Sequence, residues 1–230
     1  MADKKVVQDH DNNEVVIAKA KDFWTRYNKP IMIASTVIIL AVAGFYGYRE
    51  FVSKPRETKA VDLMFRAEAY FDMDSITKAV NGDGQNWGFA KVADQYGNTK
   101  AGKLAAYYAG ACFVKLNENE KAIKYLKKFS TDSKLVQARA YKLMGDAYAD
   151  MGKNEEALSY YKKAAYYFEK DKANSSDYLF IAAYFADKMM KNSKEAIALY
   201  KEVQEKYPGT QQAYDAENYL AQLGVYTSGN

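Results

Sequence analysis

Few residues in this chain have the chemistry of a catalyst, and they lie far apart in the sequence. The single histidine, His10, lies in a polar N-terminal stretch, whereas a Ser/His/Asp or Cys/His nucleophile needs a histidine inside the folded domain. The single cysteine, Cys112, falls in a helical pattern, and the simplest interpretation is a small buried residue. One cysteine excludes an intramolecular disulfide framework and a cysteine zinc cluster. The sequence therefore predicts no catalytic residue and no cofactor.

Carboxylates are the remaining candidates for chemistry. Asp146 and Asp150 are four residues apart, so on a helix they share a face and could act as a pair. A solvated groove face is the simpler interpretation. Residues 81–84 read NGDG, which is turn chemistry, and the acidic spacing of an EF-hand calcium loop is not present. No metal site and no small-molecule substrate is predicted, so we expect the chain not to be an enzyme.

Composition favours a helical protein that does not bind nucleic acid. The 230 residues are 49% hydrophobic and 27% charged, which suits a globular or repeat fold better than disorder. Only three prolines occur, and Ala, Lys, Glu, Leu and Tyr are frequent, so an all-α fold is expected. A net charge of +4 is too balanced to indicate a nucleic-acid groove.

An internal repeat supplies the elements that must position any functional residue. Residues 116–129, 151–164 and 190–203 align without gaps, and residues 88–99 align with residues 199–210, which extends the series to four. A repeat of paired helices with this period indicates an α-solenoid, a class that usually binds proteins. Two columns of the alignment hold Ala122, Ala157 and Ala196, and, four residues later, Leu126, Tyr161 and Tyr200.

The sequence thus predicts about four helical hairpins over residues 61–224, followed by a disordered tail at 225–230. Apolar spacing from Val61 through Phe65 to Tyr70 predicts one buried helix that opens the first hairpin. The last helix, residues 211–223, is expected to cap the solenoid with one apolar side. That side would hold Tyr214, Ala216, Tyr219, Leu220 and Leu223.

An uncharged apolar segment precedes the repeats. Residues 31–48 contain no charge and, at about 1.5 Å per residue, would span roughly 27 Å as a helix. Aromatic residues flank both ends, as at membrane interfaces, and Pro30 suits the first turn of a helix. We therefore predict a transmembrane helix at residues 30–48. The alternative, a cleaved signal peptide, conflicts with the long polar region that comes first and includes several acidic residues, where a secretory signal would have a short basic stretch.

The flanks of this segment leave its orientation and pairing open. Residues 1–29 are predicted to be a polar tail with a possible interfacial helix at residues 15–27, and residues 49–60 a stalk. Basic residues lie on both sides, so the positive-inside rule does not decide the topology. Ala43 and Gly47 form a small-xxx-small pair that could bring two membrane helices together, so a homo-oligomer is possible.

The repeat columns resemble those of the tetratricopeptide repeat. Gly110 and Gly145 are explained by close contact between the two helices of a hairpin, with Ala122 and Ala157 as the small partners across it. The fourth hairpin keeps a closing Pro208, although its first helix is out of step with the pattern by one residue. The hallmark positions of the third hairpin are filled, in order, by Tyr141, Met144, Gly145, Tyr148, Ala157, Tyr161 and Ala164.

This resemblance implies that the first helix of each hairpin lines a concave groove that binds other proteins. The mixed aromatic, basic and acidic character of the expected lining suits a peptide or a partner helix. As an alternative, Tyr107 and Tyr184 would only pack between neighbouring hairpins. The expected groove residues are Tyr107, Ala111, Val114, Lys115, Arg139, Lys142, Asp146, Asp150, Phe180 and Tyr184.

The arrangement of a short polar tail, one membrane helix and a few repeats resembles the ancillary subunit of the bacterial Sec translocon. That resemblance implies a single-pass inner-membrane protein with a cytoplasmic N-terminus and periplasmic repeats. The expected partners are translocon subunits or periplasmic chaperones, and the expected role is a scaffold in protein export. The alternative is a self-assembling repeat protein, or one that coordinates envelope assembly or division, since the closing turn and final helix also resemble envelope-assembly proteins.

Overall fold

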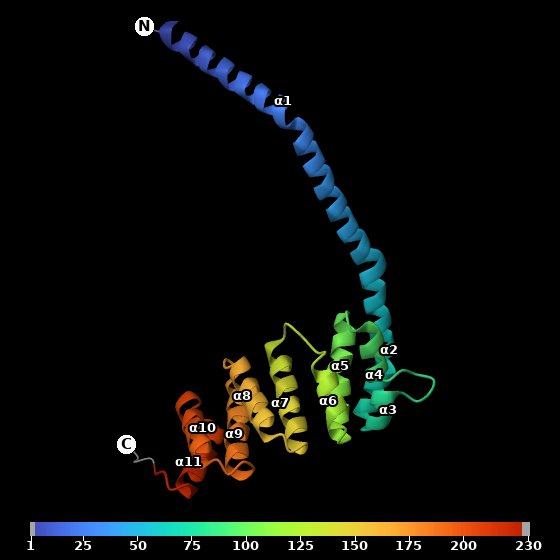
Figure 1. Ribbon diagram of the computed structural model, residues 1–230, viewed down its shortest axis with the longest axis vertical. Coiled ribbons are helices and arrows are strands. Elements are labelled where there is room, and N and C mark those ends of the chain that lie inside the picture. The colour runs from blue at the N-terminus through green and yellow to red at the C-terminus, as the bar shows by residue number, and fades with distance from the viewer. Residues whose placement is uncertain (1–2, 227–230) are drawn as a thin grey trace. The chain divides into compact units, whose positions relative to one another are not determined.

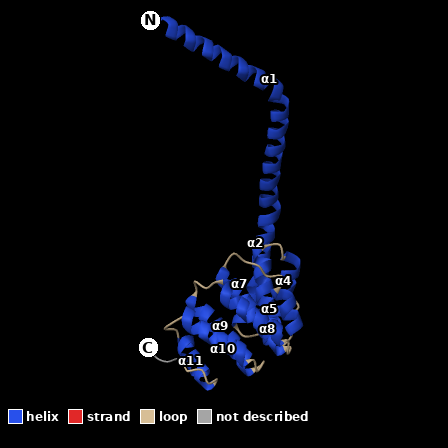
Figure 2. Cartoon of the chain, turned by 60° about the vertical axis from the view of Figure 1, so that its left-hand side comes forward, coloured by secondary structure: helices blue, strands red, loops and turns tan. Residues whose placement is uncertain are grey.

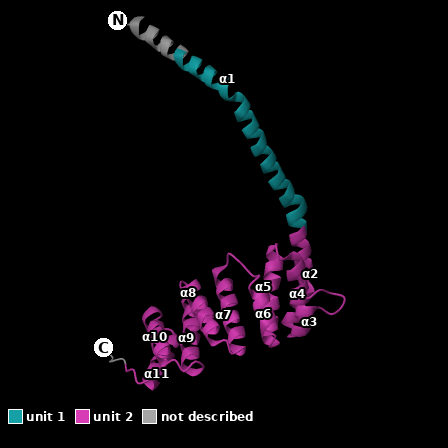
Figure 3. Ribbon diagram, viewed as in Figure 1, with its two compact units in different colours: residues 1–55 teal, residues 56–230 magenta. Residues whose placement is uncertain are grey.

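The computed structural model describes residues 3–226, with side chains from residue 15 onward. The chain divides into two compact units, residues 1–55 and residues 56–230 (Figure 3). Within the described residues all regular structure is helical, and the one β-type contact is an isolated antiparallel bridge between Gly82 and Trp87 (Figure 2). The predicted all-α class is confirmed.

The first unit is built on one long helix. Helix α1 runs over Asp3–Tyr48 and continues into a short π-helix, η1, at Arg49–Ser53. The prediction that a helix begins at Pro30 is therefore wrong, because Pro30 lies inside α1. A proline in a helix interior removes one backbone hydrogen bond and commonly bends the helix, and α1 does change direction along its length (Figure 1).

The segments on both sides of the apolar stretch, expected to be a polar tail and a stalk, are also helical. The predicted polar tail is helical from Asp3, and the predicted stalk at residues 49–60 consists of η1 and the start of α2 (Lys54–Asp72). Residues 1–2, and residues 227–230 of the predicted disordered tail, lie outside the described residues.

Helix α1 carries an apolar stretch that is long and apolar enough to cross a membrane, and the described residues contain one such stretch. None of the residues in its most apolar window is buried within the chain. Phe45, Tyr46 and Tyr48 are all more than half exposed at its C-terminal end. Exposure of this many large apolar side chains suits a helix surrounded by lipid.

The second unit is a series of helical hairpins in which neighbouring helices lie side by side in chain order (Figure 1). The first hairpin contains α2 and α4 (Phe89–Tyr96), with a short extra helix, α3 (Ile76–Asn81), between them. Three further hairpins and a final helix, α11, confirm the predicted solenoid. These helices are α5 (Lys100–Lys115) with α6 (Asn119–Leu126), α7 (Lys134–Asp150) with α8 (Asn154–Tyr167), α9 (Lys172–Lys188) with α10 (Ser193–Lys206), and α11 (Gln211–Gln222).

The turns inside three of the hairpins share one backbone conformation. Asn117, Gly152 and Lys191 occupy the same column of the repeat, and each has a left-handed backbone with φ of 57°, 70° and 55°. A left-handed residue just past a helix end reverses the chain and satisfies the last carbonyl groups. Each of the three turns therefore reverses the chain through a left-handed residue at the same position of the repeat.

Close contact between paired helices explains the repeat glycines. A Cβ on Gly145 would lie 2.5 Å from Cδ1 of Tyr161, and a Cβ on Gly110 would lie 2.5 Å from Cγ of Leu126. The predicted close approach is confirmed, but the predicted small partners, the alanine column, are not the nearest atoms. The side chain four residues after each alanine fills the space instead, because it lies one helical turn further along the same face.

The core lies between the helices and leaves some expected core residues outside. Buried Ala60, Met64 and Ala67 make one stripe along α2, whereas Val61 and Phe65 on the same helix are 54% and 66% exposed. The prediction of a helix buried on all these positions is therefore wrong. On α11 the buried residues are Ala213, Ala216 and Leu220, and Tyr214 is exposed, contrary to the predicted cap.

The N-terminal end of the second unit is fastened to two other helices. Arg56 donates from Nη2 to the carbonyl oxygen of Gln95 at 3.1 Å. The carboxylate of Glu57 accepts hydrogen bonds from the backbone amides of Lys100 at 2.8 Å and Ala101 at 2.9 Å. A side chain of α2 thus satisfies two of the amides that α5 leaves unpaired at its N-terminus, a position that also favours negative charge.

Candidate functional site

A shallow hollow of about 260 Å³ lies across the first helices of hairpins two, three and four. It brings together three of the predicted groove residues, namely Tyr107 from α5 and Arg139 and Lys142 from α7. The sequence did not indicate its other lining residues, which are Leu143, Asn174, Asp177 and Tyr178. The N-terminal half of α9, where the repeat pattern is out of step, supplies three of these four.

Arg139 is the exposed cation of this hollow and stands between two phenols. Burial raises the pKa of Tyr107 and of Tyr178, and the positive charge of Arg139 opposes that shift at both hydroxyls. No ion pair joins Arg139 to a carboxylate within 4.0 Å among the side chains that the structure describes. The guanidinium therefore keeps most of its donors for a ligand.

The second cation of the hollow is already paired. Lys142 Nζ lies 2.9 Å from Oδ2 of Asp146, one turn along α7. The hydroxyl of Tyr161, on α8, donates to the other oxygen of Asp146 at 3.1 Å. Burial raises the pKa of Tyr161, and the charges of Asp146 and the exposed Asp150 raise it further. Asp146 is thus held by a cation and a phenol, as in a structural ion pair.

The remaining predicted groove residues contact other parts of the domain. Val114 packs against the core of the first two hairpins, and the neighbouring Ala111 is half-buried. Lys115 Nζ lies 3.0 Å from Oδ1 of Asp74 and 5.3 Å from the ring centre of Phe71. Lys115 therefore contacts the first hairpin, and Val114 packs into the core that the first two hairpins share. Their role in binding a partner stays a prediction.

Phe180 and Tyr184 lie against the capping helix. Their ring centres are 5.7 Å and 5.6 Å from that of Tyr219 on α11, and both pairs are close to perpendicular. Tyr107 also packs within the domain, with its ring centre 5.2 Å from that of Phe129, although it lines the hollow as well. Packing against a neighbouring element therefore describes Tyr184 better than it describes Tyr107.

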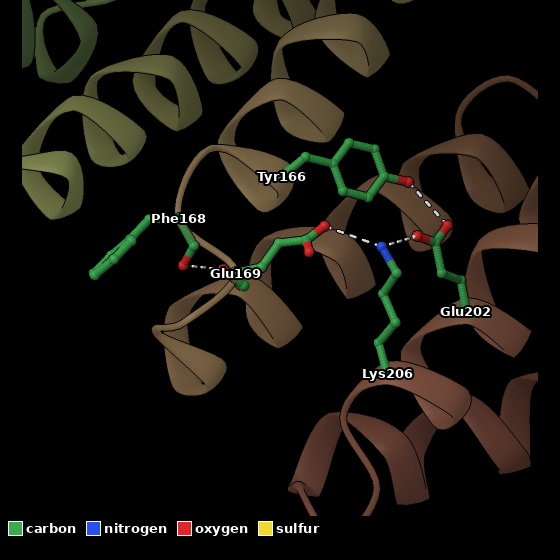
Figure 4. A network of polar contacts seen from close by, with 6 residues as sticks. Tyr166, Phe168, Glu169, Glu202 and Lys206 are labelled. Carbon is green, nitrogen blue, oxygen red and sulfur yellow. Dashed lines mark hydrogen bonds and ion pairs between the residues drawn. The ribbon is translucent and has the colours of Figure 1, made fainter.

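The second helices of hairpins three and four carry a polar network of their own (Figure 4). Lys206 Nζ lies 3.0 Å from Glu169 and 3.0 Å from Glu202, and Tyr166 donates to the other oxygen of Glu202 at 2.9 Å. These charges largely satisfy one another, so the network joins α10 to the C-terminal end of hairpin three. It leaves the hollow as the better candidate for binding.

The chemistry available at the hollow is that of recognition. It offers a guanidinium, an ammonium, two phenols, an amide and the carboxylate of Asp177, all of which can form hydrogen bonds or ion pairs with a ligand. The described side chains contain no group of three or more His, Cys, Asp or Glu that could hold a metal ion. Burial raises the pKa of the Cys112 thiol to about 12, so this cysteine stays protonated at neutral pH.

Comparison with known proteins agrees with this arrangement. The family model described as a tetratricopeptide repeat-like domain matches residues 21–140, more than half of the chain, and a tetratricopeptide repeat model matches residues 177–210. No curated protein matches the chain. Hairpin three lies mostly between the two matches, although its sequence carries the hallmark positions most completely. The chain belongs to the tetratricopeptide repeat-like domain family.

Proposed function

We propose that the chain is a membrane-anchored scaffold whose hollow across α5, α7 and α9 binds a polypeptide segment of a protein partner. The tetratricopeptide repeats support protein–protein interaction as the general role. The observation that supports this location is Arg139, an exposed cation between two phenols that forms no ion pair with a carboxylate among the described side chains. Exposed arginine and tyrosine are the residue types that most often dominate protein interfaces.

The proposed setting is the bacterial inner membrane, with the N-terminus in the cytoplasm and the repeats in the periplasm. There the chain would assist the Sec translocon or periplasmic chaperones in the export and folding of envelope proteins. The apolar stretch of α1 supports the anchor, and the family match begins at residue 21 and so includes both this stretch and the first repeats. A tether raises the effective concentration of clients, so weak binding by the hollow would suffice.

Self-assembly through the membrane segment is the second candidate. A Cβ on Gly47 would meet no atom within 4 Å, and the apolar side chains around it are exposed within the chain. This face of α1 is therefore open for a second helix, as the small-xxx-small spacing with Ala43 predicts. Light scattering of the full-length protein in detergent separates the two candidates, because a monodisperse monomer contradicts self-assembly.

The main test is purification of the tagged full-length protein from its native membrane in mild detergent, with co-purifying proteins identified by mass spectrometry. The test variant is Arg139→Glu, and the matched control is Arg66→Glu, which reverses the charge of an exposed arginine on α2. We expect wild type and control to enrich translocon subunits or periplasmic chaperones, and Arg139→Glu to lose them. Equal recovery with both variants would refute a role for the hollow.

A further inference from the structure

Asp187, near the C-terminal end of α9, is a buried carboxylate outside the hollow. The residue is 7% exposed, and among the described residues it is the acidic member of the buried polar set. Its Oδ2 atom lies 2.6 Å from Lys188 Nζ but accepts no well-directed hydrogen bond. Buried carboxylates normally accept several hydrogen bonds, because a charge removed from water is costly unless it is satisfied. This oxygen is therefore available to a better donor.

Aromatic rings from two other helices lie near the Lys188 ammonium that pairs with this carboxylate. Tyr200 on α10 stacks on Tyr219 of α11, with ring centres 5.3 Å apart and planes 13° apart, and Tyr184 lies at 89° to Tyr219. Tyr200 is fully buried, and its hydroxyl has no hydrogen-bond partner in the described structure. Burial raises the pKa of Tyr200, and the negative charge of Asp187 adds to the shift. Asp187 Oδ2 and the Tyr200 hydroxyl, both buried, thus each lack a well-directed hydrogen-bond partner.

The position of Lys188 indicates that this site favours a cation. Its ammonium nitrogen lies 5.3 Å from the ring centre of Tyr219 while it pairs with Asp187, which is the geometry of a cation between a carboxylate and an aromatic ring. The short contact with Asp187 raises the pKa of Lys188, and the neighbouring charge of Asp187 and the two tyrosines, Tyr219 and Tyr184, add to the shift. The protein's own cation therefore occupies the position of a ligand.

Lys188 is also a poor permanent occupant. It is the last residue of α9, and its side chain is 37% exposed. Consecutive residues of a helix do not face the same way, so Lys188 must fold back to reach the carboxylate of Asp187, at a cost in side-chain entropy. A cation from another molecule that donates better-directed hydrogen bonds to Asp187 Oδ2 would displace it.

We propose that Asp187 and Tyr219 form a receptor for one arginine side chain of a protein partner, with Lys188 as its placeholder in the free protein. A guanidinium presents five donors in a plane, so it can donate to Asp187 Oδ2 while it lies against the ring of Tyr219, where the ammonium of Lys188 lies in the free protein. An ammonium is a point charge and cannot match that shape. Tyr184, which is 42% exposed, gives the site an edge open to solvent.

This receptor adds a second point of recognition to the proposed scaffold and uses no residue of the hollow. Along α9, Asp187 lies nine residues beyond Tyr178, roughly 13 Å at the helical rise. The two sites can therefore be tested separately. The receptor is tested with a small probe, whereas the hollow is tested by recovery of protein partners with Arg139→Glu.

The test is calorimetric titration of the full-length protein in detergent with N-acetyl-arginine amide. The control ligand is N-acetyl-citrulline amide, which has nearly the same shape without the charge. Lys188→Ala removes the placeholder and should tighten arginine binding by about fivefold, the effect of an ion pair worth about one kcal/mol. Lys172→Ala, at the other end of α9, removes an exposed lysine and should change nothing. Citrulline should not bind to any variant.

Two further variants decide whether the carboxylate is the receptor. Asp187→Asn in the Lys188→Ala background should abolish arginine binding while the circular dichroism spectrum stays unchanged. Lys188→Arg places the proposed ligand on the chain itself, so it should block the probe and raise the midpoint of thermal unfolding above that of wild type. Equal binding of arginine and citrulline would overturn the proposal. So would Lys188→Ala with wild-type affinity, or Lys188→Arg that still binds the probe.

Discussion

Gly102, in the first turn of α5, lies where two stretches of backbone nearly touch. A Cβ at this position would lie 1.9 Å from the carbonyl oxygen of Tyr96, so Gly102→Ala forces α4 and α5 apart. That oxygen accepts from the backbone amide and the hydroxyl of Thr99, each at 2.8 Å. The same hydroxyl accepts from the Gly102 amide at 2.9 Å and so caps α5. One added methyl group therefore disturbs three hydrogen bonds.

The expected loss follows from these bonds. Three hydrogen bonds at about 1 kcal/mol each amount to about 3 kcal/mol, and the better helix propensity of alanine returns about 1 kcal/mol. We expect Gly102→Ala to lower the free energy of unfolding by about 2 kcal/mol, which corresponds to roughly 4–8 °C in a domain of this size.

The assay is thermal and urea unfolding of the full-length protein in detergent, followed by circular dichroism. Gly47→Ala is the matched control, because it makes the same chemical change where a Cβ meets nothing within 4 Å. Gly145→Ala should fall between the two, since the atoms that it approaches belong to a side chain. Gly102→Ala with the unfolding midpoint of the control would show that the contact between α4 and α5 does not require glycine.

Three further predictions concern single side chains. Glu57→Ala should destabilise the domain by about 1 kcal/mol in urea unfolding, because two amides at the start of α5 lose their acceptor; an unchanged midpoint would contradict this cap. Burial raises the pKa of Asp94, but hydrogen bonds from Lys128 and Tyr125 outweigh this effect and lower the pKa below its usual value. The ionised carboxylate of Asp94 therefore stabilises the fold fully above the usual aspartate pKa of about 3.9, and this contribution is lost as the pH falls through the lower pKa of the folded state. Asp94→Asn should therefore lose less stability than wild type between pH 7 and pH 3, and equal losses would refute this assignment. Cys112 should react with a thiol reagent at pH 8 only as fast as the domain unfolds, because the residue is fully buried and burial raises the pKa of its thiol to about 12. Rapid labelling of the native protein would contradict this burial.

The parts of the fold that could be predicted are those in which one local pattern repeats. The alanine column marks the second helix of three hairpins, and a left-handed residue occupies the same column in each of their turns. Gly110 and Gly145 indicated close helix packing, but the sequence named the wrong neighbours. Spacing tells which residues share a face, whereas the angle between two helices decides which of them meet.

The parts that were missed depend on contacts that a repeat does not encode. Helix α3 is six residues long, which is too short to show a helical period in the sequence, and the turn residues that follow it gave the segment the pattern of a loop. Tyr178 was missed because the first helix of the fourth hairpin departs from the repeat register. Phe180 and Tyr184 were assigned to the groove by position, but α11, which follows the last repeat, covers that end of α9. A terminal hairpin packs against a different neighbour from an internal one.

The bonds made by Arg56 and Glu57 have a mechanical consequence. They are the first two residues of the second unit, and each is tied to a different helix, through the Gln95 carbonyl at the end of α4 and the amides that open α5. Tension along the chain from the first unit would thus reach two helices at once, with several bonds loaded in parallel. Such a linkage resists pulling better than one whose bonds break in succession, so α2 would not separate from the domain alone, and the domain would stay folded under a load that breaks any one of these bonds.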